Sequence, residues 1–285
     1  MHLSSSLFAF LTWGVSPLTA NPLPQSSPPQ TGGTGPFAPA EYTTISPLRS
    51  HTLYLPKSVP ASSRLPIILW GNGGCSADGL GFRPFLTQIA SHGFFILASG
   101  TPNGKGQTTA ALMTQGVDWV NSAEAKAKYP FLETSRIAVA GMSCGGVEAY
   151  TAGHNDSRVS TIGIFNSGLL SVAESEKIAK NLRKPVFYFL GGESDIAYAN
   201  KQGERDYKYL PAGTPSWKGN LPVGHGGTYS EKNGGKFGVA AVAYFDWVLR
   251  GNAKASEYFK NDAEAKNAGW KVESKNLDGI KVTPL

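Results

Sequence analysis

The stretch "RIAVAGMSCGG", Arg136–Gly146, decides the fold that the sequence predicts. Its first seven residues are a short apolar run that is typical of a strand buried on both faces, and a helix is predicted from Ser143 to about Ala152. A serine with glycines two positions before and after it, between a strand and a helix, is the pattern of a nucleophile elbow. The pattern predicts that Ser143 is held as a nucleophile on a strained turn, beside which only very small residues fit.

The same alternation of strand and helix extends in both directions from this elbow. Strands are predicted near residues 42–45, 51–55, 65–74, 94–100, 136–142, 160–166, 184–192 and 215–221, and helices near 82–93, 108–122, 143–152, 172–182 and 237–251. Such alternation indicates one α/β domain with a mostly parallel central sheet and helices on both faces. Only about five residues separate Asn166 from the helix at Val172, so we expect no large lid insertion and an open binding face.

An acid and a histidine follow later strands in the order that a serine nucleophile requires. Asp195 comes just after the strand at 184–192, with Glu193 as the nearby alternative. His225 lies in the glycine-rich loop "LPVGHGGTY", and it is the one histidine of five that follows the final predicted strand. Ser143, Asp195 and His225 are therefore the predicted catalytic residues.

These residue types predict acyl transfer. His225 would take the proton of Ser143 as its oxygen attacks an acyl carbon, while Asp195 orients the imidazole. The developing oxyanion needs two backbone N–H donors. Cys144, directly after the serine, is the first candidate; Cys75 is the second, with Gly74 and Asn72 as alternatives in the loop "WGNGGCS".

The chain has two cysteines, and this reasoning places both at the oxyanion site. Donors to one oxygen lie close together, so a Cys75–Cys144 disulfide is geometrically feasible. The alternative is two buried free thiols. Cys144 as the nucleophile is disfavoured, because its side chain would point away from the reacting carbonyl.

The N-terminal sequence and the net charge limit the expected location and partners of the protein. Residues 1–20 resemble a signal peptide and residues 21–40 a disordered leader rich in proline, glycine and serine, which leaves a folded domain at 41–285. The formal charge is +6, but the basic residues form no run, which argues against a nucleic-acid partner. We expect a secreted monomer with no membrane span, no cofactor and no metal.

At this point the chain resembles the α/β-hydrolase superfamily, in the branch of dienelactone hydrolases and cutinase-like polyester hydrolases, over residues 66–251. The matching segments are "ASHGF" (90–94), "GGESDIA" (191–197) and, loosely, "PVGHGG" (222–227). The resemblance implies the triad Ser143, Asp195 and His225 and an oxyanion donor at the Cys144 backbone. Two departures stand out: Cys75 occupies a position that is usually aromatic, and dienelactone hydrolases have a cysteine where this chain has Ser143.

The sequence thus predicts a secreted serine esterase, cutinase-like or polyesterase-like, that cleaves a small or polymeric ester. Candidate substrate contacts are Trp70, Gly74, Phe82 and Tyr198, whereas Trp119 fits the core better. A non-catalytic binding protein on the same fold, a peptidase and an acyltransferase are the alternatives. Asn155 begins an Asn-Asp-Ser pattern for glycosylation.

Overall fold

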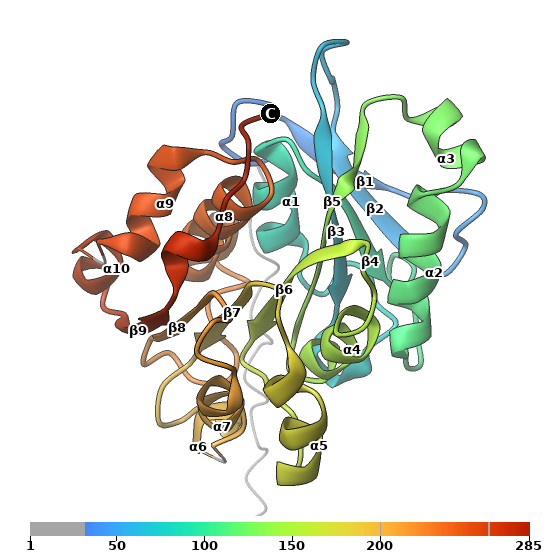
Figure 1. Ribbon diagram of the computed structural model, residues 1–285. Coiled ribbons are helices and arrows are strands. Elements are labelled where there is room, and N and C mark those ends of the chain that lie inside the picture. The colour runs from blue at the N-terminus through green and yellow to red at the C-terminus, as the bar shows by residue number, and fades with distance from the viewer. Residues whose placement is uncertain (1–31, 200, 262) are drawn as a thin grey trace, which may run out of the picture.

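The computed structural model describes residues 32–199, 201–261 and 263–285 (Figure 1). Within these residues one sheet has the strand order β1-β2-β4-β3-β5-β6-β7-β8-β9. Its strands are β1 (Ala40–Thr43), β2 (His51–Pro56), β3 (Leu65–Gly71), β4 (Phe95–Ser99), β5 (Leu132–Met142), β6 (Val159–Phe165), β7 (Val186–Leu190), β8 (Ser216–Asn220) and β9 (Lys271–Lys275).

The sheet is mostly parallel. Strands β4, β3, β5, β6, β7 and β8 pair in parallel, whereas β2 runs antiparallel to both β1 and β4, and β9 runs antiparallel to β8. Because parallel strands end at the same edge of a sheet, the loops after β5, β7 and β8 lie together. These loops carry the three predicted catalytic residues.

Helices cover both faces of the sheet, and Figure 1 shows α2, α3 and α4 on one side and α8, α9 and α10 on the other. The helices are α1 (Arg83–Ser91), α2 (Ala110–Val120), α3 (Ala123–Lys128), α4 (Cys144–Gly153), α5 (Val172–Lys177), α6 (Ile196–Ala199), α7 (Gln202–Tyr209), α8 (Gly235–Val248), α9 (Ala253–Lys260) and α10 (Ala263–Asn267). Short 3-10 turns lie at Gly73–Cys75, Ala179–Asn181, Lys232–Gly234 and Leu277–Gly279.

Each central strand is buried on both faces, which explains the continuous apolar runs of the sequence. In β3, Ile68 and Trp70 belong to the core under α1 and α8, and Ile67 and Leu69 belong to the core under α2 and α4. The predicted α/β class with a mostly parallel sheet is confirmed.

Some elements differ from the prediction. Strand β9 was not predicted, because "KVESK" is largely exposed at the sheet edge and shows no apolar alternation. The predicted helix at 172–182 is α5 followed by a separate 3-10 turn. The short connection expected after β6 is present, since residues 166–171 join it to α5.

The folded part also begins before the predicted boundary at Glu41. The Phe37 amide donates to the carbonyl of Ser91 at 2.9 Å, and the Ala40 amide donates to the carbonyl of Gly32 at 2.7 Å. Backbone contacts with the end of α1 thus hold residues that composition assigned to a leader. The predicted signal peptide, residues 1–20, and leader residues 21–31 lie outside the described residues.

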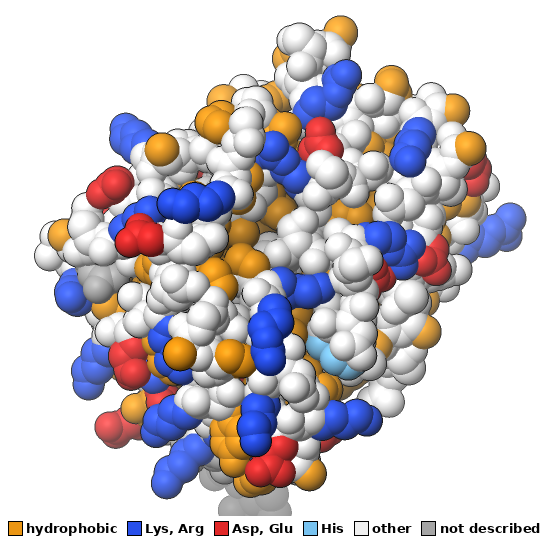
Figure 2. Space-filling model, in the orientation of Figure 1, with side chains coloured by type: hydrophobic (Ala, Val, Ile, Leu, Met, Phe, Trp, Pro, Cys, Tyr) orange, Lys and Arg blue, Asp and Glu red, His pale blue; other side chains and the backbone are white. Residues whose placement is uncertain are grey.

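Two properties of the described residues bear on partners. No helix among them is long and apolar enough to cross a membrane. Figure 2 shows Lys and Arg side chains dispersed over the visible face and mixed with Asp and Glu, as the absence of a basic run in the sequence leads one to expect.

Candidate active site

Ser143 lies on the tight turn between β5 and α4. Its φ of 54° and ψ of −118° put a non-glycine residue in a strained region of backbone space. A Cβ on Gly145 would lie 2.1 Å from the backbone of Gly71, and one on Gly141 would lie 2.3 Å from the backbone of Gly145. The glycines of the elbow are therefore required by the close approach of β3, β5 and α4.

The structure brings Ser143, His225 and Asp195 into one hydrogen-bonded row. His225 Nε2 lies 2.9 Å from Ser143 Oγ, and His225 Nδ1 lies 2.7 Å from Asp195 Oδ1. An ionised carboxylate can only accept, so Nδ1 carries the ring proton and Nε2 accepts from the serine hydroxyl. This is the tautomer that a general base needs.

Burial distinguishes Asp195 from its predicted alternative. The Asp195 side chain is fully buried, whereas Glu193 is exposed, and no hydrogen bond or ion pair joins Glu193 to His225 in the described part of the chain. The His225 side chain is 28% exposed, which leaves its ring open to a substrate beside Ser143.

Both carboxylate oxygens of Asp195 are occupied. Oδ1 also accepts from the Ala197 amide at 3.0 Å, and Oδ2 accepts from the Gly191 amide at 2.7 Å and from Asn166 Nδ2 at 2.8 Å. Four donors thus fix the rotation of the acid. Sequence reasoning missed Asn166, because an asparagine at the end of a strand is unremarkable without the partner that the fold gives it.

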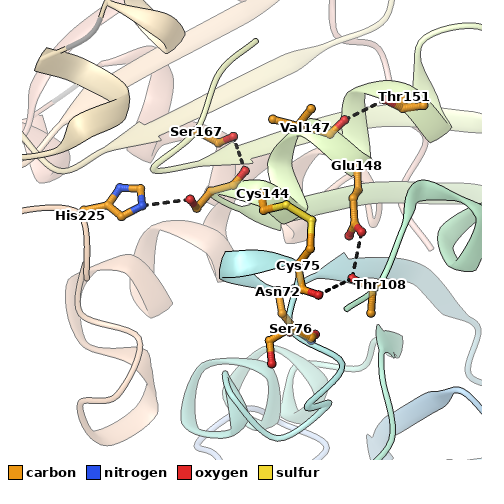
Figure 3. The surroundings of a disulfide bond; sticks show 11 residues. Asn72, Cys75, Ser76, Thr108, Cys144, Val147, Glu148, Thr151, Ser167 and His225 are labelled. Carbon is orange, nitrogen blue, oxygen red and sulfur yellow. Dashed lines mark hydrogen bonds between the residues drawn. A yellow bond between two sulfur atoms is a disulfide. The ribbon is translucent and has the colours of Figure 1, made fainter. Parts of the chain in front are cut away.

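The predicted Cys75–Cys144 disulfide is present, with the two Cα atoms 5.1 Å apart, and the alternative of two free thiols is wrong for this structure. Figure 3 shows the disulfide joining the turn after β3 to the start of α4, with His225 beside the elbow. The predicted donor loop is therefore tied covalently to Cys144, the residue that follows Ser143.

Hydrogen bonds of the Asn72 side chain also hold the Cys75 loop in place. Asn72 is buried, and its Nδ2 lies within 3.1 Å of three carbonyl oxygens, those of Ser76, Asp78 and Ser99. Cys75 has a φ of 48°, so the loop is held in a conformation that few non-glycine residues adopt.

A buried acid lies under the disulfide, on α4. The Thr108 hydroxyl is 2.9 Å from Glu148 Oε1 and 3.2 Å from the Cys75 carbonyl oxygen, as Figure 3 shows. Burial raises the pKa of Glu148 above its ordinary value. Through Thr108, the elbow helix and the Cys75 loop are linked by hydrogen bonds as well as by sulfur.

Some of the backbone N–H groups at the elbow already donate to acceptors within the protein. The Gly145 amide donates to the Asn72 carbonyl at 3.1 Å and the Gly146 amide to the Ser143 carbonyl at 2.9 Å. Cys144 is the first residue of α4, where backbone N–H groups have no acceptor inside the helix. The oxyanion roles of Cys144 and Cys75 remain predictions.

The predicted substrate contacts lie in different places. Trp70 is fully buried and packs against Phe82 and Phe85, so the prediction that it lines the site is wrong; alternation along β3 turns it into the core. Trp119 is also in the core, as expected. Gly74 is exposed in the Cys75 loop.

Tyr198 lies in α6, which begins directly after Asp195. It lines a cavity of about 260 Å³ together with Glu193, Ser194 and Pro222. Three exposed apolar side chains lie in the segments that follow β6, β7 and β8: Leu170, Ile196 and Val223, which are 65%, 54% and 38% exposed. They follow the same strand ends as Asn166, Asp195 and His225, so the edge of the sheet that holds the candidate site carries apolar surface.

No protein-family model matches the chain, and no curated protein is significantly similar to it.

Proposed function

We propose that the protein is a serine hydrolase that cleaves carboxylic esters through an acyl-enzyme on Ser143. The observation that carries the proposal is His225 in hydrogen-bond contact with both Ser143 Oγ and a fully buried Asp195. A nucleophile, a base within reach of it and a third group that orients the base are the parts that acyl transfer requires.

We further propose that the fold is the α/β-hydrolase fold. The proposal is supported by the strand order, the antiparallel β2 and the chain order in which the nucleophile follows β5, the acid follows β7 and the histidine follows β8. The strained turn at Ser143 adds a feature that such nucleophile elbows share.

The reaction proceeds in two halves. His225 Nε2 takes the Ser143 proton as Oγ adds to the ester carbonyl, and the imidazolium then protonates the departing alcohol. Water next attacks the acyl-enzyme, with His225 again as base; the imidazolium then returns the proton to Ser143 Oγ as the acyl–oxygen bond breaks, and the acid product leaves. Asp195 keeps Nδ1 protonated throughout and stabilises the positive ring.

During each attack, negative charge gathers on the carbonyl oxygen. The Cys144 amide at the start of α4 is one donor to it, and the disulfide-linked loop around Cys75 supplies the other. The helix dipole of α4 adds positive potential at the same point.

The substrate class that the surface supports is an ester with an apolar portion. Leu170, Ile196 and Val223 expose apolar area at the catalytic edge, and residues 166–171 leave no room for a large lid. A bulky or polymeric ester is therefore compatible with the site. The disulfide supports export, because such bridges persist in oxidising compartments.

Labelling with a fluorophosphonate tests the proposal. We expect one covalent adduct at Ser143 by peptide mass spectrometry, and Ser143→Ala should lose both the adduct and about 10⁴-fold or more of kcat on p-nitrophenyl esters. Ser62→Ala, at an exposed serine between β2 and β3, should keep both. An unlabelled native protein would favour the binding-protein alternative, and a rate within tenfold in Ser143→Ala would refute the nucleophile.

A substrate panel distinguishes the remaining enzyme classes. Esters of increasing acyl length, a matched anilide series and a competing alcohol acceptor should show hydrolysis of esters with little anilide cleavage or transfer. Preference for anilides would indicate a peptidase, and transfer that outpaces hydrolysis would indicate an acyltransferase.

A further inference from the structure

We propose that Asn166, oriented by Tyr229, is a positioning residue. It holds the catalytic acid, Asp195, and the loop that carries His225 in a fixed position relative to each other. The inference rests on the proposed function and extends it to two residues that touch no substrate. Its basis is a continuous row of hydrogen bonds that begins at the buried Tyr229 and passes through Asn166, Asp195 and His225 to Ser143.

Asn166 is held rigidly at the end of β6. Its backbone has a φ of 43°, and its amide donates to the Phe189 carbonyl of β7 at 2.7 Å. The side chain is fully buried, so it has no access to a substrate. A side chain held in this way can act on the reaction only through its neighbours.

The carboxamide of Asn166 joins the two loops that carry the acid and the base. Nδ2 lies 2.8 Å from Asp195 Oδ2 and 3.3 Å from the carbonyl oxygen of Gly224, the residue before His225. One donor group therefore touches the acid itself and the backbone next to the base. Loss of the group would remove one of the four donors to Asp195 and a contact to the His225 loop at once.

Tyr229 determines which way this carboxamide faces. Its hydroxyl makes a short hydrogen bond to Asn166 Oδ1. Tyr229 is buried among the rings of Phe82, Phe85 and Phe237, and burial raises the pKa of its hydroxyl, which keeps the hydroxyl protonated. A donor at Oδ1 favours the orientation in which the amide nitrogen faces Asp195. In the reversed orientation the amide oxygen would face the Asp195 carboxylate, and the two acceptors would repel each other.

The surrounding packing leaves little tolerance for movement. A Cβ on Gly191 would lie 2.0 Å from the Gly224 oxygen and 2.7 Å from Asn166 Nδ2. The acid loop, the histidine loop and the end of β6 thus meet at van der Waals contact. A small rotation of the Asn166 amide would be passed to Asp195 and then to the His225 ring.

The first test removes one hydroxyl group. We expect Tyr229→Phe to lower kcat about tenfold with KM changed less than twofold, because acid orientation is lost while the substrate surface is intact. Tyr244→Phe is the matched control, since that buried hydroxyl bonds Thr161 at 2.7 Å instead. An unchanged kcat in Tyr229→Phe overturns the inference.

The second test replaces the amide by an acid. In Asn166→Asp, the new carboxyl can donate to Asp195 only while protonated, and the two carboxylates repel each other once both are ionised. The titratable groups facing this position are Asp195, Tyr229 and, through Asp195, His225. The ratio of kcat/KM in the variant to that in the native protein should therefore fall as pH rises from 5 to 9.

A purely structural role would lower that ratio equally at every pH, and a flat ratio overturns the inference. The low-field proton resonance of His225 Nδ1 provides a readout that needs no turnover; it should shift in both variants and stay in place in Tyr244→Phe. If the native protein neither labels nor turns over esters, the proposed function fails, while the resonance still tests the positioning. Should Asn166→Asp fail to fold, Tyr229→Phe decides alone.

Discussion

Only glycine fits at position 145, because three elements of the fold approach each other closely there. Its Cα lies where β3, β5 and α4 converge, and its amide donates to the Asn72 carbonyl. The sequence pattern identified this glycine, because the need for a side-chain-free position is local to the elbow. The same pattern gave no indication of Asn166, whose role depends on residues 29 to 63 positions away.

At the residue scale we predict that Gly145→Ala lowers the free energy of unfolding by about 3 kcal/mol, the upper range for overpacking a tight site. The added methyl would collide with the backbone of Gly71, which cannot rotate away as a side chain would. Urea denaturation measures the change.

Gly213→Ala is the matched control. A Cβ there meets nothing within 4 Å, so its effect should lie within about 0.5 kcal/mol of zero. Equal stability of the two variants would show that the elbow tolerates a methyl group.

At the scale of elements, one buried acid, Asp206, holds α7 against the connection that follows β6. Asp206 accepts from the Leu169 amide at 2.7 Å and from the Ser175 hydroxyl at 2.5 Å, so it joins α7 to the residues that follow Asn166. Helix α7 was not predicted, since it is short and strongly polar. Its contribution becomes visible only when its partners in α5 and the loop are known.

Burial raises the pKa of Asp206 to about 6, and its hydrogen bonds oppose the shift without cancelling it. The value lies above the roughly 3.9 of an unfolded aspartate, so the folded state binds more protons between the two values. Stability should therefore gain up to about 3 kcal/mol from this group as pH falls from about 6 towards 4. Asp206→Asn should lose that gain.

Denaturation at pH 4.5 and 7.5 measures this difference. Asp118→Asn, at an exposed aspartate, controls for the removal of a carboxylate from the surface. Identical pH dependence in the native protein and Asp206→Asn would contradict the assignment.

For the whole molecule, the disulfide joins two segments that are 69 residues apart. It closes a loop containing α1, β4, α2, α3 and β5, about a quarter of the chain, and it does so at the edge of the sheet that carries the predicted catalytic residues. Stability and the geometry of the predicted oxyanion loop are therefore connected by one bond.

Reduction should lower the free energy of unfolding by about 4 kcal/mol, the loop-closure entropy for a loop of this size. We also expect kcat to fall while the fold persists at moderate temperature, because the Cys75 loop loses its tie to α4. Thermal unfolding and ester hydrolysis with and without reductant measure both effects.

A Cys75→Ala, Cys144→Ala double variant supplies the control, since it should be insensitive to reductant and resemble the reduced protein. Full stability in reductant, with both thiols shown to be free, would contradict the prediction.

By itself the sequence determined the α/β class, the strand-turn-helix around Ser143 and the order of Asp195 and His225, and it left the pairing of Cys75 with Cys144 beside the alternative of two free thiols. These follow from local periodicity and from the rule that parallel strands end at one edge. Only the tertiary structure decided that Asp195 rather than Glu193 meets His225, that Cys75 and Cys144 are bonded, that Trp70 is core, that residues 32–40 belong to the fold and that Asn166 contacts both Asp195 and Tyr229. Those features depend on contacts between distant segments, whose distances and burial are set by packing and leave no periodic trace in the chain.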